Sequence, residues 1–172
     1  ESLGAIERDA EALTLAAHHA LGGEGIISYG GHRIDLDLPW DRLSVREAIE
    51  RYAGATLPDF SLASIRNAAL HAELGMQASW ENDAPLLFSL LMDHIQPSLG
   101  TSKPVFIGDW PAFETSSAAE KTGDTAERSE LFIAGVEISD GFPSLTDPDR
   151  QIETFEHQNA RRRADGIPEV DV

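Results

Sequence analysis

Apolar side chains recur every three or four residues near the start of the chain. They are Ile6, Ala10, Leu13, Ala17 and Ala20. Because residues at this spacing share one face of a helix, the pattern predicts an amphipathic helix over residues 3–21. Gly22-Gly23 follows directly, and glycine at this point is typical of a helix end.

Two short extended segments come next, at 26–29 and 33–38. Gly30-Gly31 between them is a hairpin signal. Apolar and charged residues alternate along the second segment, which predicts a strand with one buried face. The apolar positions of that strand are Ile34, Leu36 and Leu38. Pro39-Trp40 is expected to end it.

Four further helices are expected. Ser44 with Glu47 three residues later forms a capping-box signature, which predicts a helix that continues to about Tyr52. Pro85 suits the first turn of a helix that ends near Ile95. The other two predicted helices cover 62–74 and 147–164.

Residues that favour strands dominate 104–110 and 130–138. The second segment contains a turn at Ala134-Gly135, and Asp140-Gly141 is interpreted as a further turn. The polar stretch 114–125 is expected to be a mobile loop. Since neighbouring strands are joined by hairpins or by several helices, the sequence predicts an α/β (α+β) fold with a mainly antiparallel sheet flanked by helices.

The chain has 172 residues, a formal net charge of −17 and no cysteine. The absence of cysteine excludes disulfides and thiolate zinc sites and makes the cytoplasm the default compartment. Because an acidic surface repels phosphate backbones, this stretch alone is expected to bind nucleic acid poorly. No apolar run approaches the roughly 20 residues of a membrane span, so no membrane partner is expected.

Few motifs point to a site. The six histidines show no metal-ligand spacing, and the phosphate-loop and nucleophile-elbow patterns are absent. The basic cluster Arg161-Arg162-Arg163 is either the solvated end of a charged helix or a phosphate contact.

Glu137 lies between Val136 and Ile138, in a segment whose neighbours favour burial. A carboxylate buried there must be paired, hydrogen-bonded or bound to a metal, because burying it alone costs several kcal/mol. The alternative is a glutamate on an edge strand that faces solvent. The residues alone leave both interpretations open.

The segment 126–147 resembles the lysine branch of the class II aminoacyl-tRNA synthetases, whose members carry a run of the form ERFELFxGGxEIxNGFxELxDP. The matching residues are Glu127-Arg128, Glu130 to Ile133, Gly135, Glu137-Ile138, Gly141-Phe142, Leu145 and Asp147-Pro148. Two upstream stretches match the same family in the same order, 27–49 and 103–111. The end of the chain, 159–168, is more similar to the truncated paralogues that modify a lysine of translation elongation factor P.

The resemblance implies that residues 1–172 are part of a class II catalytic domain, an ATP- and Mg²⁺-dependent ligase that activates an amino acid. By the same resemblance the acceptor is tRNA or elongation factor P, and the complete protein is a homodimer. In the family the position of Glu137 holds ATP and its magnesium, together with Ile138. The family's amino-acid site corresponds to Asp140, Gly141, Phe142 and Ser144.

Three positions depart from the family pattern. Asp140 replaces an asparagine, Ser144 replaces the glutamate that pairs with the lysine ammonium, and Ser129 replaces a packed phenylalanine. The loss of a charge-assisted contact predicts weakened lysine binding, and the extra charge of Asp140 is expected to repel the substrate carboxylate.

The family's two arginine motifs are expected to flank this stretch, so the chain alone is expected to be inactive. Two alternatives remain. One is a non-catalytic, synthetase-like binding or regulatory module, and the other is an acidic α/β domain with accidental matches.

Overall fold

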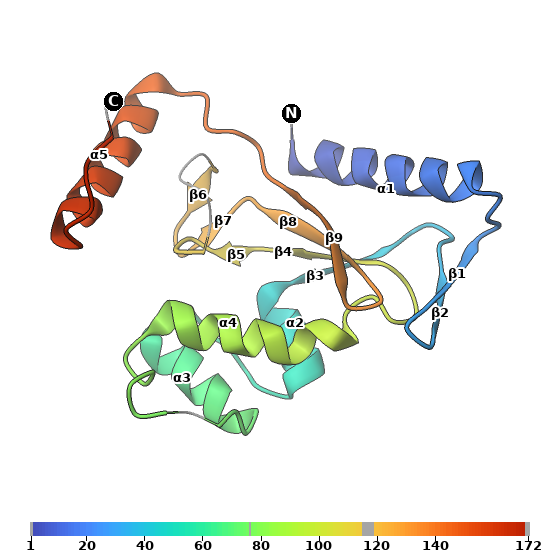
Figure 1. Cartoon of the computed structure of the whole chain (residues 1–172), viewed down its shortest axis with the longest axis horizontal. Coiled ribbons are helices and arrows are strands. Elements are labelled where there is room, and N and C mark those ends of the chain that lie inside the picture. Colours follow the sequence, from blue (N-terminus) through green and yellow to red (C-terminus); the bar gives the residue numbers. More distant parts are fainter. Residues whose placement is uncertain (1, 76, 115–118, 171–172) are drawn as a thin grey trace.

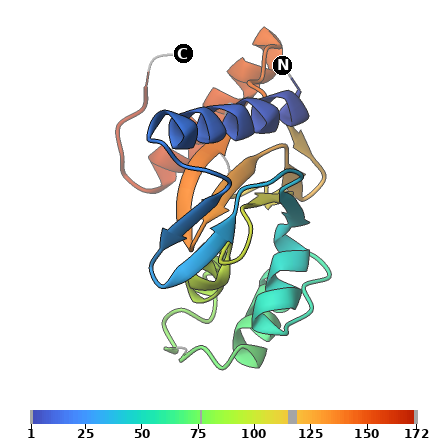
Figure 2. The same cartoon turned by 90° about the vertical axis from the view of Figure 1, so that its right-hand side faces the viewer.

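The computed structural model describes residues 2–75, 77–114 and 119–170. A central sheet lies between α1 on one face and the helices α2, α3 and α4 on the other (Figures 1 and 2). Helix α5 stands apart from the sheet in Figure 1. The helices are α1 (Leu3–Ala20), α2 (Val45–Ala53), α3 (Leu62–His71), α4 (Ala84–Ile95) with the 3-10 turn η1 (Gln96–Ser98), and α5 (Pro148–Ala164).

The central sheet has four strands in the order β3-β4-β8-β9, so that β9 forms an edge. Its strands are β3 (Asp41–Ser44), β4 (Val105–Gly108), β8 (Ser129–Ile133) and β9 (Val136–Gly141). Strands β3 and β4 are parallel, and they are the only parallel pair in the described part of the chain. The predicted mixture of helices with largely antiparallel strands is therefore confirmed, whereas β3 was not predicted.

The two faces of the sheet belong to two separate apolar clusters. Val105 and Ile107 of β4 pack with α2, α3 and α4. Phe106, between them in sequence, packs with Leu131 on the face toward α1. This alternation is the period of two expected of a strand buried on both sides.

Local chemistry sets the boundaries of several elements. Ser44 and Glu47 form the predicted capping box, in which the Ser44 hydroxyl accepts from the Glu47 N–H and the Glu47 carboxylate accepts from the Ser44 N–H. Asp83 caps α4 through the N–H of Leu86. Each pairing satisfies backbone donors that a helix start leaves free.

The hairpin of β1 (Ile26–Tyr29) and β2 (His32–Asp35) is confirmed, and both glycines of its turn have positive φ. Strand β2 ends at Asp35, three residues before the predicted end. The Trp40 indole N–H donates to the Leu36 carbonyl at 2.9 Å, so the chain already turns here. As a result Leu38 is exposed and does not share the buried face of Ile34.

The hairpin of β8 and β9 has its predicted turn at Ala134-Gly135, where φ is 53° and 75°. The predicted turn at Asp140-Gly141 is wrong, because β9 continues to Gly141 and pairs it with Ser129. Cross-strand hydrogen bonding overrides the local turn preference of this dipeptide.

The segment after β4 is more structured than expected. Asp109, with φ of 54°, separates β4 from β5 (Trp110–Pro111). Strands β6 (Lys121–Thr122) and β7 (Thr125–Ala126) then join β5 in a small sheet of order β5-β7-β6. The mobile loop predicted over 114–125 is therefore wrong for its second half, while 115–118 lie outside the described residues.

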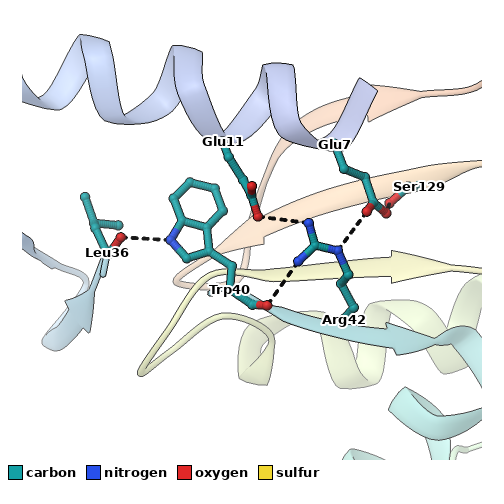
Figure 3. A network of polar contacts seen from close by, with 6 residues as sticks. All are labelled: Glu7, Glu11, Leu36, Trp40, Arg42 and Ser129. Carbon is teal, nitrogen blue, oxygen red and sulfur yellow. Dashed lines mark hydrogen bonds and ion pairs between the residues drawn. The ribbon is translucent and has the colours of Figure 1, made fainter. Parts of the chain in front are cut away.

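Helix α1 is tied to the sheet by one guanidinium group (Figure 3). Arg42 of β3 donates to Glu7 at 2.8 Å and to Glu11 at 2.9 Å, two carboxylates on successive turns of α1. Ser129 of β8 donates its hydroxyl to Glu7 at 2.8 Å. Ser129, one of the departures from the family pattern, thus replaces a packed ring with a polar contact to α1.

The basic cluster Arg161-Arg162-Arg163 lies in the last turn of α5. Arg162 donates to the Pro168 carbonyl, and Arg163 pairs with Glu169 at 2.6 Å. Cations at a helix C-terminus are favoured by its dipole, so the structure favours the helix-end interpretation of this cluster. In the part of the chain that the structure describes, we find no helix that combines the length and the apolar character needed to cross a membrane.

Candidate active site

Three carboxyl groups meet where β8 and β9 pair. Glu130 of β8 and Glu137 and Asp140 of β9 each place one oxygen within 4.8 Å of the other two. Glu130 is directly opposite Asp140 in the register of the two strands. We call these three residues the carboxylate cluster.

A β-bulge brings Glu137 to the same face as Asp140. In a regular strand, residues three apart point to opposite faces. Here the register shifts, so that Leu131 is opposite Ser139 while Phe132 is opposite Glu137, and Ile138 is the additional residue of β9. A bulge redirects the side chains beyond it, which returns Glu137 to the face of Asp140.

This face of the sheet is the one opposite α1. Glu130 is followed in the strand by Leu131, which packs in the cluster beneath α1, so its own side chain points the other way. Glu137 and Asp140 are exposed. The cluster is therefore open to a ligand from this side.

The buried carboxyl group is Glu130. For Glu137 the sequence left burial and an exposed edge strand both open, and the structure agrees with the exposed edge strand. The side chain of Glu130 is 5% exposed. Glu137 is on an edge strand whose apolar residues Val136 and Ile138 are themselves 40% and 49% exposed. Burial depends here on the position of each strand in the sheet, because all five residues of β8 are buried between β4 and β9.

Arg128 lies against the cluster. Its Nε donates to Asp140 Oδ1 at 2.9 Å and its Nη2 to Asp140 Oδ2 at 3.1 Å. The same Nη2 makes a short contact with Glu130 Oε1. The third nitrogen, Nη1, donates to the Glu114 carbonyl at 2.8 Å, and the guanidinium lies 4.7 Å from the centre of the Trp110 ring.

The electrostatics of the site follow from these contacts. Burial raises the pKa of the Glu130 carboxyl to about 8, and the charges of Glu137 and Asp140 act in the same direction against Arg128. Burial lowers the pKa of Arg128, but the Asp140 hydrogen bond and the three negative charges outweigh it and raise this pKa overall. Burial also raises the pKa of Glu114.

Oxygen ligands of this kind fit a divalent cation. Mg²⁺ binds through one or two carboxylates and keeps positions for water or phosphate oxygens. Among the described residues, no hydrogen bond or ion pair reaches the side chain of Glu137. Glu137 is thus the carboxylate of the cluster that is most available to an external cation.

The other predicted site residues are distributed around the cluster. Ile138 lines a groove of about 950 Å³ beneath α1, on the other side of β9. Gly141 ends β9, and a Cβ there would lie 2.6 Å from Cγ2 of Ile6, so the approach of α1 requires a glycine. Phe142 is half-buried, and Ser144 is exposed and forms an isolated bridge with Ala119.

The sequence model of the family described as "tRNA synthetases class II (D, K and N)" matches residues 8–167. The chain belongs to this family. The resemblance to the lysine branch and to the paralogues acting on elongation factor P is thereby confirmed, since the curated relatives come from both groups.

Three class II relatives illustrate the range of similarity. An elongation factor P--(R)-beta-lysine ligase of Yersinia enterocolitica is 35% identical over 132 residues, which cover 75% of this chain and 41% of the relative. The corresponding ligase of Salmonella paratyphi B is 34% identical over 134 residues, which cover 76% of this chain and 41% of the relative. A lysine--tRNA ligase of Methanoculleus marisnigri is 36% identical over 145 residues, which cover 82% of this chain and 28% of the relative.

The chain thus spans less than half the length of these class II relatives. Within the spanned part, sequence reasoning named Glu137 and Asp140 but gave no role to Glu130 and Arg128. Both belong to the matched family motif, and Arg128, which directly precedes β8, is two residues from Glu130. This spacing was the available signal for an ion pair.

Proposed function

We propose that this chain is part of an ATP- and Mg²⁺-dependent ligase that activates an amino acid of the lysine type and transfers it to tRNA or to a lysine of elongation factor P. Membership of the class II family supports the ligase chemistry, and the names of the relatives give the two acceptors. The proposed compartment is the cytoplasm, because both proposed acceptors act in translation. The observation that carries the proposal is the carboxylate cluster, three carboxyl oxygens within 4.8 Å.

In the proposed reaction the amino-acid carboxylate attacks the α-phosphate of ATP. A bond from that carboxylate to phosphorus forms, the bond to the β-phosphate oxygen breaks, and pyrophosphate leaves. Magnesium, when bound, neutralises the triphosphate. The residues proposed to hold it are Glu137, which is exposed and has no hydrogen bond or ion pair within the described part of the chain, and Glu130, which Arg128 orients.

Asp140 is proposed to lie beside the amino-acid substrate, with Gly141, Phe142 and Ser144. Arg128 binds both oxygens of Asp140, so the charge of this residue is largely compensated. The repulsion of the substrate carboxylate expected from the sequence is reduced accordingly. Ser144 offers a hydroxyl where an ammonium would require a carboxylate, which supports weak binding of lysine itself.

Exchange of labelled pyrophosphate into ATP tests the proposal, with the protein encoded by the complete natural reading frame. With lysine or β-lysine as substrate, Glu137→Gln is expected to lower exchange at least about 100-fold, since a cation-binding carboxylate becomes a neutral amide. Glu50→Gln, an exposed glutamate on α2, serves as the matched control and should exchange like the wild type. Equal exchange by the Glu137→Gln protein would contradict the proposed site.

A non-catalytic module of the same family is the second candidate. It is favoured by Asp140, whose two oxygens are both engaged by Arg128, together with the neutral Ser144. The same assay separates the two candidates. Background exchange with every amino acid tested, combined with retained ATP binding in equilibrium dialysis, would support the module.

A further inference from the structure

Arg128 makes two kinds of contact, and only one of them is with acids. The carboxylate contacts are to Asp140 and Glu130. The remaining contacts are the hydrogen bond to the Glu114 carbonyl and the stacking on Trp110. Because these last two do not involve the cluster, they hold the guanidinium in place even when the acids bind something else.

We infer that Arg128 is a resident counter-cation of the carboxylate cluster, which weakens the binding of a free divalent cation and leaves the site to a cation that arrives with a triphosphate. This inference rests on the proposed function, and it concerns how that site selects its metal. It makes Arg128 a positioning residue, since its guanidinium acts through Asp140 and Glu130.

Arg128 already occupies most of the ligand atoms of the cluster. A carboxylate ligates a hard cation through its oxygens. Both Asp140 oxygens and one Glu130 oxygen already accept hydrogen bonds from Arg128. Of the cluster, the described contacts leave only Glu137 without such a partner. A free cation therefore finds one ready carboxylate, whereas the bare cluster would offer three.

The positive charge of Arg128 also opposes the binding of a free cation. The three carboxyl groups lie within 4.8 Å of one another and make this site negative, and Arg128 supplies one positive charge at hydrogen-bond distance from Glu130 and Asp140. A fixed positive charge this close repels an incoming cation, and the half-buried setting of Arg128 limits screening by water. Removing the guanidinium therefore removes both the competitor and the repulsion.

In the wild type, a triphosphate that accompanies the cation restores cation binding. A cation bound to a triphosphate brings phosphate oxygens as its own ligands, and so needs few from the protein. Its net charge is also negative, so the guanidinium attracts the complex that it would repel as a bare ion. The arrangement thus favours the complexed cation over the free one.

The test uses the 172-residue chain and free Mn²⁺, a paramagnetic substitute for Mg²⁺, titrated by electron paramagnetic resonance without nucleotide. Arg128→Gln is expected to bind Mn²⁺ at least tenfold more tightly than the wild type. Arg128→Lys keeps the charge and should stay within about threefold of the wild type. Equal or weaker binding by Arg128→Gln overturns the inference, and so does equal tightening by Arg128→Lys.

Arg46→Gln provides the matched control. Arg46 of α2 also lies over an aromatic ring, Phe60, and also pairs with an aspartate, Asp124 in the turn between β6 and β7. Neither contact involves the carboxylate cluster. Its substitution should leave the Mn²⁺ affinity unchanged. Tightening in this variant would mean that overall charge, and not the position of Arg128, controls the affinity, and would overturn the inference.

A measurement on the wild type covers the case in which Arg128→Gln does not fold. The Nε–H of Arg128 is bonded to Asp140, so its nitrogen-15 resonance, assigned by its absence in Arg128→Lys, reports on that bond. Saturating Mg²⁺ should shift this resonance and leave that of Arg46 in place. An unchanged Arg128 signal at saturation overturns the inference. The proposed function fails separately, if pyrophosphate exchange does not depend on Glu137.

Discussion

At the scale of single residues, Glu130 carries a carboxyl group into the centre of the sheet, where its ionised form is disfavoured. Burial is the largest cause, and Arg128 only partly offsets it. The neighbouring Glu137 and Asp140 add to the effect. The folded protein therefore retains a proton on Glu130 at pH values where the unfolded chain has released it.

We predict from this that Glu130 makes stability fall as pH rises. The pKa of Glu130 is about 8 in the folded state against 4.5 for an unperturbed glutamate, so between these values the folded state binds more protons than the unfolded state. Its contribution is complete below about pH 4.5 and decreases through pH 8. Relative to Glu130→Gln, the wild type should lose at least about 1 kcal/mol of unfolding free energy from pH 5 to pH 8.

Urea unfolding at pH 5, 6.5 and 8 measures this difference. Glu50→Gln is the control, and its difference from the wild type should not vary with pH. A gap that stays constant for Glu130→Gln, or that changes in favour of the wild type at high pH, would contradict the assignment of the buried proton to Glu130.

At the scale of elements, α1 and β9 approach each other more closely than side chains normally allow. The approach occurs at Gly141, the last residue of β9, against Ile6 of α1. Gly141 does not need its glycine for a special φ, since it adopts ordinary strand geometry. Its small size is what lets the helix lie on the end of the strand that carries Asp140.

Gly141→Ala should therefore destabilise the chain through this contact, by about 1–3 kcal/mol for an overpacked site. Ile6→Ala removes the methyl group in the way, so Gly141→Ala in that background should cost less than about 0.5 kcal/mol. Thermal or urea unfolding of the wild type, the two single variants and the double variant measures the coupling free energy between Gly141 and Ile6. Gly75→Ala, where a Cβ meets nothing within 4 Å, is the control, and additive effects at Gly141 and Ile6 would refute the contact.

The sequence predicted correctly those features that are formed by residues close together in the chain. The capping box of Ser44 and the turn at Ala134-Gly135 are each formed by residues adjacent in sequence, and both are confirmed. The bulge at Ile138 depends on how β9 pairs with β8, and the burial of Glu130 depends on β8 lying between two other strands. No pattern within one segment contains that information, so both were missed.

At the scale of the whole molecule, few polar contacts hold helix α1 on the sheet. Arg42 makes two of these contacts, because it binds both Glu7 and Glu11 (Figure 3). The side chains of these two glutamates are only 13% and 11% exposed. The guanidinium also lies 5.0 Å from the centre of the Phe106 ring. Two poorly hydrated carboxylates thus depend on one cation.

Arg42→Met should cost about 2–4 kcal/mol of unfolding free energy, because it removes the cation from both carboxylates and leaves Glu7 with only the Ser129 hydroxyl. The triple variant Arg42→Met, Glu7→Gln, Glu11→Gln should recover at least half of the loss, since the unpaired charges are gone. Chemical denaturation measures both, with Arg33→Met on the exposed face of β2 as the control. A loss below about 0.5 kcal/mol, typical of an exposed ion pair, would show that α1 is held by its apolar contacts alone.

In evolutionary terms, the bulge makes the register of β9 with β8 as important to the site as the side chains of β9. Regular pairing over the same number of residues would place Glu137 opposite Ile133 and so carry it to the face beneath α1. Every acidic residue of the cluster would still be present in the sequence. A lineage could thus lose its cation site through the loss of one bulge, a change that a comparison of residue types alone would not register.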